Sequence, residues 1–334
     1  MSRYSRQELF APIGPEGQAR IAASRVLLVG CGALGSHLAE FCARAGVGRL
    51  LLIDRDIVEE SNLQRQGLFT EADVRQSMPK AVAAARHLQA INSACRVQAL
   101  VGEFGPANAE ELVRAHDLVL DATDNFDTRF LVNEACVKWG VPWVYAACVS
   151  SRAACMPVLP GGACLACLLE EPPQAGGETC ETAGVIMPAV LQAVAWSSVV
   201  ALKILSGNPA ALFRRMFSVD LWSGERTSLD ASRPRAGCPV CQERRWDYLE
   251  GRRGLRTAVL CGRHSVQIRP QGVFDFVAQR ARLREAGAVK LESEYLLQLK
   301  DGDLELTLFA DGRGLVHGTS DEVRARSLYA RWVG

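Results

Sequence analysis

The chain has 334 residues, which is longer than one average domain and long enough to bury a full core. Its 38 Lys and Arg residues balance its 37 Asp and Glu residues, so the net charge excludes no fold and gives no reason to expect nucleic acid or a membrane as partner. The N-terminal residues lack the apolar stretch of a secretory signal, which predicts a cytoplasmic protein. We expect two domains, residues 1–250 and 255–334.

The first recognisable pattern is a strand, a glycine loop, a helix and a second strand. Residues 24–30 and 49–54 are apolar runs typical of buried strands, and a helix is expected between them. The loop contains Gly30, Gly32, Ala33 and Gly35, where backbone N–H groups can approach phosphates at a helix N-terminus. Asp54 follows about 20 residues later, where a carboxylate can accept hydrogen bonds from ribose hydroxyls. The unit predicts a Rossmann-like α/β domain with a mostly parallel sheet, for NAD or for ATP.

The residues after the second strand favour a triphosphate over a dinucleotide. Arg65 lies in the polar segment that follows Asp54, and Lys80 begins the next helical pattern. Two cations suit a triphosphate better than a single pyrophosphate. The next buried strand, residues 117–120, runs into Asp124, which is expected at the carboxyl edge of the sheet and can hold Mg²⁺. Each feature alone has an ordinary explanation, because a glycine loop can serve packing and surface cations are usually solvated.

In combination these segments resemble the ThiF/MoeB/HesA family of adenylating enzymes, prokaryotic relatives of ubiquitin-activating enzymes. The resemblance covers about three quarters of the chain and rests on five segments in family order, namely Arg3–Gln7, Gly30–Ser36, Asp54–Gln66, Pro79–Lys80 and Asp121–Asn125. It implies an enzyme that uses MgATP to adenylate the C-terminal Gly-Gly carboxylate of a ubiquitin-like sulfur-carrier protein. The products would be an acyl-adenylate and pyrophosphate, with a cysteine desulfurase or a rhodanese as sulfur donor.

The resemblance also implies roles for individual residues. Asp54 would bind the ribose, Asn62, Arg65 and Lys80 the phosphates, and Asp124 the metal that accompanies ATP. The implied nucleotide contacts are Gly30, Gly32, Ala33, Gly35, Asp54, Asp56, Ser61, Asn62, Arg65, Gln66, Lys80, Asp124 and Asn125. Arg6 would reach across a homodimer interface into the partner's ATP site. The implied catalytic set is therefore Arg6, Arg65, Lys80, Asp124 and Cys180.

The twelve cysteines include two matched Cys-x-x-Cys motifs. The four thiols, Cys164, Cys167, Cys238 and Cys241, have the number and spacing of a closed tetrahedral zinc site. A lone Cys-x-x-Cys could also be a redox disulfide, but the matched pair favours structural zinc. The metal would tie the long excursion between the two motifs back onto the domain.

Cys180 lies in a stretch rich in proline and glycine, residues 170–182, where a thiol is accessible. In the family a cysteine at this position can join the carrier through a thioester or an acyl-persulfide. The alternative is a spectator thiol, because adenylation needs no cysteine. Residues 185–205 are apolar enough to suggest a membrane span, but Pro188, Gln192 and Lys203 favour a buried core or dimer helix.

From residue 257 onward, short strands and two helices predict a small α+β module without a visible catalytic constellation. Carrier specificity and dimer support are both open as its role. For the whole chain, three other classes remain possible. These are an enzyme that adenylates a small molecule or a modified tRNA base, an NAD-dependent dehydrogenase, and a binding module without catalysis.

Overall fold

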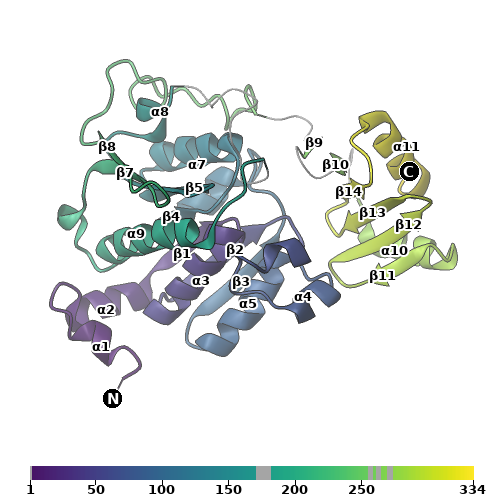
Figure 1. The fold of residues 1–334 in the computed structure, drawn as a ribbon, viewed down its shortest axis with the longest axis horizontal. Helices are drawn as coiled ribbons and strands as arrows, with labels where there is room; N and C mark the ends of the chain where they lie inside the picture. The colour runs from purple at the N-terminus through teal and green to yellow at the C-terminus, as the bar shows by residue number, and fades with distance from the viewer. Residues whose placement is uncertain (1, 171–181, 255–258, 261–264, 269–273) are drawn as a thin grey trace. The chain divides into compact units, whose positions relative to one another are not determined.

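The computed structural model describes residues 2–170, 182–254, 259–260, 265–268 and 274–334. The chain divides into two units, Met1–Gly254 and Leu255–Gly334 (Figure 1).

An eight-stranded sheet in the order β3-β2-β1-β4-β5-β6-β7-β8 forms the centre of the first unit. Its parallel strands are β1 (Arg25–Val29), β2 (Arg49–Asp54), β3 (Arg96–Val101), β4 (Leu118–Asp121) and β5 (Trp143–Val149). Its antiparallel strands are β6 (Arg152–Val158), β7 (Arg215–Asp220) and β8 (Arg226–Asp230). The predicted Rossmann-like, mostly parallel sheet is confirmed.

Helices cover both faces of this sheet (Figure 1). They are α1 (Ser5–Glu8), α2 (Gly14–Ala23), α3 (Ala33–Ala45), α4 (Glu71–Arg75), α5 (Lys80–Ile91), α6 (Ala109–Arg114), α7 (Phe126–Trp139), α8 (Leu165–Leu168) and α9 (Met187–Leu205). Alternate residues of β1 point to opposite faces, since Val26 and Leu28 join the core with α3, α5 and α9, while Leu27 and Val29 join the core with α6 and α7. Because both faces are covered, β1 is apolar throughout its buried length.

Among the described helices, α9 is the one long and apolar enough to cross a membrane by length and composition. It packs against α3, β5 and β6, and its buried residues include Ala189, Val190 and Ala193. These contacts are those of a core helix. Leu191 and Val199 of the same helix are nevertheless exposed, so one side of α9 remains uncovered in the single chain.

The second unit is built on an antiparallel sheet in the order β11-β12-β13-β14-β10-β9. Its elements are β9 (Val259–Leu260), β10 (Ser265–Ile268), α10 (Phe276–Glu285), β11 (Val289–Glu292), β12 (Leu296–Asp301), β13 (Leu304–Phe309), β14 (Gly314–His317) and α11 (Glu322–Trp332). The sequence did not predict β11. This edge strand has four residues and a register shift between Val289 and Leu291, so its alternation is too short to recognise.

Candidate functional site

The candidate site lies at the carboxyl ends of β1, β2 and β4. These strands are parallel neighbours with β1 in the middle, so the loops that follow them meet at one edge of the sheet. The chain passes from β1 to β2 on one side and reaches β4 on the other, which is where ligands of such folds bind. Gly30 and Gly32 lie in the loop after β1, Asp54 is the last residue of β2, and Asp124 lies in the loop after β4.

The glycines of the loop serve two different purposes, close packing of the backbone and open space for a ligand. A Cβ on Gly30 (φ +91°) would lie 2.8 Å from the carbonyl oxygen of Ala122, and a Cβ on Gly35 would lie 2.0 Å from the carbonyl oxygen of Gly30. These two allow β1, α3 and the loop after β4 to pack closely. A Cβ on Gly32 would approach nothing nearer than the side-chain nitrogen of Gln66, at 4.0 Å. Gly32 therefore leaves open space at the N-terminus of α3, where phosphates bind.

The Asp54 carboxylate joins the glycine loop to the loop after β2. One oxygen accepts a hydrogen bond from the backbone N–H of Cys31 at 2.6 Å, and the other accepts from that of Asp56 at 2.7 Å. Burial raises the pKa of Asp54, and the nearby ammonium of Lys80 opposes that rise. Each carboxylate oxygen keeps a second lone pair, so the structure leaves room for the predicted bond to ribose.

Lys80 is a buried cation at this edge. It begins α5 and is only 4% exposed, and its backbone N–H donates to the carbonyl oxygen of Asp56 at 2.8 Å. Its Nζ lies 3.3 Å from Asp56 Oδ2. Because Lys80 is buried, the alternative that it is an ordinary solvated surface lysine is wrong. A buried ammonium is costly unless carboxylates or a ligand's phosphates compensate its charge.

The polar segment between β2 and α4 contains five of the predicted residues, namely Asp56, Ser61, Asn62, Arg65 and Gln66. Asn62 is buried, and Arg65 Nη1 donates to the carbonyl oxygen of Ser61 at 2.8 Å, which orients the guanidinium. Gln66 is buried near Gly32, and its Oε1 has no hydrogen-bond partner among the described residues. An orphaned buried acceptor beside the glycine loop is what a nucleotide site leaves for its ligand.

The loop after β4 is organised by a buried ion pair that the sequence did not indicate. Asp121 Oδ1 accepts from the backbone N–H and hydroxyl of Thr123, and its Oδ2 lies 3.4 Å from Arg129 Nε. Arg129 Nη2 also donates to the carbonyl oxygen of Thr123 at 2.6 Å. Burial raises the pKa of Asp121, and Arg129 opposes that rise. This pair fixes the backbone immediately before Asp124.

Asp124 itself is exposed at the sheet edge, where the sequence placed a metal ligand. Asn125 serves a structural purpose, because its Oδ1 accepts from the backbone N–H of Thr128 at 2.8 Å and caps α7. Asp124 is thus presented at the start of a capped helix, with its carboxylate free of that capping bond.

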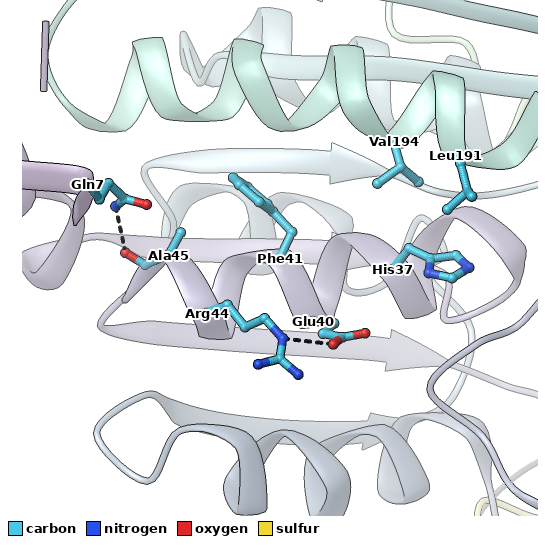
Figure 2. Close-up of a pocket in the computed structure, with 8 residues that line it drawn as sticks. All are labelled: Gln7, His37, Glu40, Phe41, Arg44, Ala45, Leu191 and Val194. Carbon is cyan, nitrogen blue, oxygen red and sulfur yellow. Dashed lines mark hydrogen bonds and ion pairs between the residues drawn. The ribbon is translucent and has the colours of Figure 1, made fainter. Parts of the chain in front are cut away.

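Arg6 is not brought together with the other predicted catalytic residues. It is exposed on α1, and the next residue, Gln7, donates to the carbonyl oxygen of Ala45 at the C-terminal end of α3 (Figure 2). The glycine loop lies at the opposite end of this 13-residue helix, about 20 Å away. Arg6 therefore cannot reach the glycine loop of its own chain.

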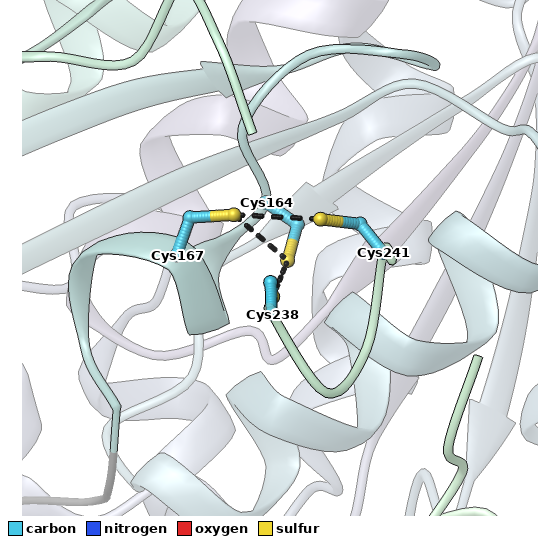
Figure 3. A group of neighbouring side chains, drawn as sticks. All are labelled: Cys164, Cys167, Cys238 and Cys241. Carbon is cyan, nitrogen blue, oxygen red and sulfur yellow. Dashed lines mark hydrogen bonds between the residues drawn. The ribbon is translucent and has the colours of Figure 1, made fainter. Parts of the chain in front are cut away.

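The four cysteines of the two motifs form one cluster (Figure 3), called here the cysteine cluster. Their sulfur atoms all lie within 4.8 Å of one another, and neighbouring pairs are 3.4 to 3.9 Å apart. Tetrahedral zinc with bonds of about 2.3 Å requires separations of about 3.8 Å. Four thiolates at these distances suit a closed structural zinc site.

Helix α7 holds both chain segments next to the cysteine cluster. Asn133 Oδ1 accepts from the backbone N–H of Leu165, which lies within the first motif, at 2.9 Å. Glu134 Oε2 accepts from the backbone N–H groups of Tyr248 and Leu249, beyond the second motif, at 2.9 and 3.0 Å. Burial raises the pKa of Glu134 from 4.5 to about 7, although these N–H groups oppose the rise.

This raised pKa predicts a pH-dependent stability. A carboxyl whose pKa is higher in the folded state stabilises fully below pH 4.5, and the contribution disappears as the pH rises through about 7. It amounts to about 3 kcal/mol. Glu134→Gln removes the titrating group, so the variant should not lose this stability as the pH rises. The difference in melting temperature between wild type and variant should therefore shift by about 6 °C against the wild type between pH 5 and 8. Thermal unfolding across that range measures it.

Glu110→Gln is the matched control. A hydrogen bond from Lys138 lowers the pKa of Glu110, so its contribution is present at neutral pH and lost on acidification. Glu110→Gln should therefore leave the profile between pH 5 and 8 as it is in the wild type and change it only below pH 4.5. The same change in both variants between pH 5 and 8 would contradict the assignment of Glu134.

Cys180 lies outside the described residues. Beyond it, the backbone N–H of Ser150 donates to the carbonyl oxygen of Gly184 at 2.8 Å, and the N–H of Ile186 donates to the carbonyl oxygen of Ser150 at 3.0 Å. The chain after Cys180 is thus anchored just past the carboxyl end of β5.

The fold and the sheet-edge site define a Rossmann-like nucleotide-binding protein with a separate zinc-type cysteine cluster. Residues 4–240 match the model of the ThiF family. The sulfur carrier protein ThiS adenylyltransferase of Bacillus subtilis is 46% identical and aligns over 99% of both chains. The SAMP-activating enzyme E1 of Haloferax volcanii is 35% identical over 75% of this chain and 92% of its own. The chain belongs to the ThiF family.

A solved structure shares the fold. Escherichia coli MccB with ATP superposes with a TM-score of 0.63 at 23% sequence identity, over 72% of this chain and 73% of that one.

Proposed function

We propose that the chain is an adenylyltransferase that activates the C-terminal Gly-Gly carboxylate of a ubiquitin-like sulfur-carrier protein. The observation that carries the proposal is the convergence of the glycine loop, buried Lys80 and exposed Asp124 at one sheet edge of a ThiF family chain. The similarity to ThiS adenylyltransferase over 99% of both chains supports the carrier as substrate.

In the proposed reaction the carrier's carboxylate attacks the α-phosphorus of ATP, and pyrophosphate leaves. The carboxylate is already ionised, so positioning and neutralisation of phosphate charge provide the catalysis. Gly32 gives the phosphates access to the N-terminus of α3, Lys80 and Arg65 supply positive charge, and Asp54 accepts from the ribose. Asp124 would hold Mg²⁺, which screens the charge of the phosphate oxygens when bound.

The proposal includes a homodimer in which Arg6 serves the partner subunit. Two observations support this arrangement. Arg6 cannot reach its own glycine loop, and Leu9 and Phe10, directly beyond α1, are exposed apolar residues that a partner could cover. A cavity of about 400 Å³ is lined by Gln7 of α1, Phe41 of α3 and Leu191 of α9 (Figure 2).

We place the carrier's folded body on the hairpin formed by β7 and β8. Strand β8 is the edge of the sheet, and all five of its residues are exposed. Trp222, in the turn before it, is 84% exposed. An open strand edge can pair with a strand of a partner, and an exposed tryptophan is a typical energetic anchor of an interface.

Trp222→Ala should therefore weaken carrier binding. We expect KM for the carrier to rise about tenfold or more, with kcat and the KM for ATP unchanged, because the side chain touches only the partner. Steady-state pyrophosphate release at varied carrier concentration measures the change. Trp139→Ala removes another exposed tryptophan of the first unit, at the end of α7, and is the control that should leave KM unchanged.

We further propose that Cys180 takes the activated carrier into a covalent adduct, with a cysteine desulfurase or a rhodanese as sulfur donor. The proline- and glycine-rich sequence around Cys180 and the resemblance support this role. Cys180→Ala should remove any adduct that reducing agents cleave and should retain ATP-pyrophosphate exchange. An adduct that survives the substitution, observed by mass spectrometry, assigns the chemistry to another thiol.

We also propose that residues 255–334 form a separate domain concerned with carrier choice or dimer support. The alignment with the Bacillus relative includes this region, whereas that with the Haloferax relative covers three quarters of the chain.

The deciding experiment for the function is ATP-pyrophosphate exchange with Mg²⁺ and a panel of Gly-Gly-ending carriers. Exchange that depends on a carrier supports the proposal. Exchange that depends instead on a small carboxylate or a tRNA base would show that the chain adenylates that substrate. Reduction of NAD without exchange would show that it is a dehydrogenase.

A further inference from the structure

The four thiols of the cysteine cluster are unequally covered. Cys164 and Cys238 are almost completely buried, and Cys167 is 9% exposed. Among the ten cysteines that the structure describes, Cys241 is the one that is not buried. Because the reactivity of a thiolate depends on access, Cys241 is the thiol of the cluster that a reagent meets first.

A cavity leads to this thiol. It measures about 460 Å³ and is lined by Cys241 together with Lys138, Trp139, Gly162, Pro234, Gln242 and Arg244. Since one water molecule takes about 30 Å³ in the liquid, the cavity can admit a small solute such as a peroxide. Arg244 adds positive charge to its lining, whereas the charge of Lys138 is balanced by Glu110 at 2.6 Å.

Cys167 and Cys241 also differ in the hydrogen bonds that their sulfur atoms accept from the backbone. The backbone N–H of Arg235 donates to Cys167 Sγ at 3.3 Å, and such a bond withdraws electron density from a metal-bound thiolate. The described hydrogen bonds place no backbone N–H on Cys241 Sγ. Cys167 Sγ and Cys241 Sγ lie 3.4 Å apart, closer than Cys164 Sγ is to Cys167 Sγ or to Cys238 Sγ.

We propose that Cys241 is an oxidation site for hydroperoxides and that Cys167 resolves it, so that the cysteine cluster opens reversibly under oxidising conditions. The Cys241 thiolate attacks one peroxide oxygen, an S–O bond forms as the O–O bond breaks, and the leaving oxygen takes a proton from water. The product is a sulfenic acid at Cys241. The inference depends on the cluster and is independent of the proposed adenylation.

In the second step the Cys167 thiolate attacks the sulfenic sulfur. An S–S bond forms, the S–O bond breaks, and the departing hydroxide takes a second proton and leaves as water. The two sulfur atoms together lose two electrons, which the peroxide's O–O bond receives. The sulfurs need to approach by little more than 1 Å to reach bonding distance. With two of four ligands removed, zinc is released.

The test uses the full-length zinc-loaded protein and hydrogen peroxide. Zinc release is followed with a chromogenic chelator, and disulfides are mapped by mass spectrometry after the remaining thiols are blocked. We expect one zinc released for each Cys167–Cys241 disulfide, and reductant with added zinc should restore the cluster. A first disulfide between Cys164 and Cys238, which are also close at 3.7 Å, would overturn the proposal. Two other results would also overturn it: zinc that stays bound while other cysteines oxidise, and a purified protein that contains no zinc.

A pair of variants tests the cavity without touching a ligand. Gln242 is exposed and lines the cavity next to Cys241. Gln242→Trp should block access and slow zinc release by peroxide about threefold or more, while Gln242→Ala should leave the rate unchanged or raise it. Both should keep the zinc content and melting temperature of the wild type. Equal rates in the two variants would show that the cavity is not the route.

Discussion

Asp124→Asn should lower Mg²⁺-dependent ATP-pyrophosphate exchange by about a hundredfold to a thousandfold, because it removes the proposed metal ligand at the point where phosphate charge develops. The amide keeps the shape of the side chain but cannot supply the negative charge that binds the ion. Asp124 is exposed and makes no capping bond, so its replacement should leave the melting temperature unchanged. Exchange rates at increasing Mg²⁺ measure the effect, and high Mg²⁺ should recover part of the loss.

Asp127→Asn is the matched control, since this carboxylate lies in the first turn of α7, close to Asp124 in the chain, and is partly exposed. It should leave exchange within about twofold of the wild type. If both variants lose activity alike, the general negative charge of this helix end matters, and Asp124 has no individual role. If Asp124→Asn retains full exchange, the metal must be held elsewhere.

Cys238→Ser should remove bound zinc and lower the melting temperature of the first unit by about 10 °C, because loss of a structural metal is among the largest effects of a single substitution. Cys238 is completely buried, and its sulfur lies 3.7 Å from Cys164 Sγ. A serine hydroxyl is a poor zinc ligand, so only three thiolates would remain of the four that tetrahedral zinc requires. Metal analysis of the purified protein and differential scanning calorimetry measure the two consequences together.

Cys95→Ser separates loss of metal from loss of a buried thiol. Cys95 is buried outside the cysteine cluster, so this variant should keep one zinc per chain and lose only about 1–2 kcal/mol of stability. If Cys238→Ser and Cys95→Ser behave alike, the cluster does not hold zinc. Treatment of the wild type with a zinc chelator should reproduce the Cys238→Ser result and leave Cys95→Ser as sensitive as the wild type.

The parts of the fold that the sequence predicted are those controlled by local pattern. The apolar run of β1, the glycines before α3 and the two Cys-x-x-Cys motifs each combine residue type with fixed spacing. Parallel strands then bring their carboxyl ends together, so the meeting of Asp54 and Asp124 at one edge followed from the order of the strands.

What the sequence missed depends on tertiary burial. Arg129 and Glu134 are charged residues within a helical pattern, where the default expectation is exposure to solvent. Only the packed structure shows that Arg129 pairs with Asp121 beneath the loop, and that Glu134 receives the N–H groups of a segment more than a hundred residues away. No local signal connects Glu134 with residues so distant in the chain.

The distance along α3 between Arg6 and the glycine loop has a genetic consequence. If Arg6 completes the partner's site, an Arg6→Ala allele and an Asp124→Asn allele, each inactive alone, should complement each other in one cell. The mixed dimer has one site that lacks both residues and one intact site. Random pairing makes about half of the dimers mixed, so about a quarter of the wild-type activity should return. Two alleles that alter Asp124 and Lys80 should not complement, because both residues belong to the same sheet edge of one chain.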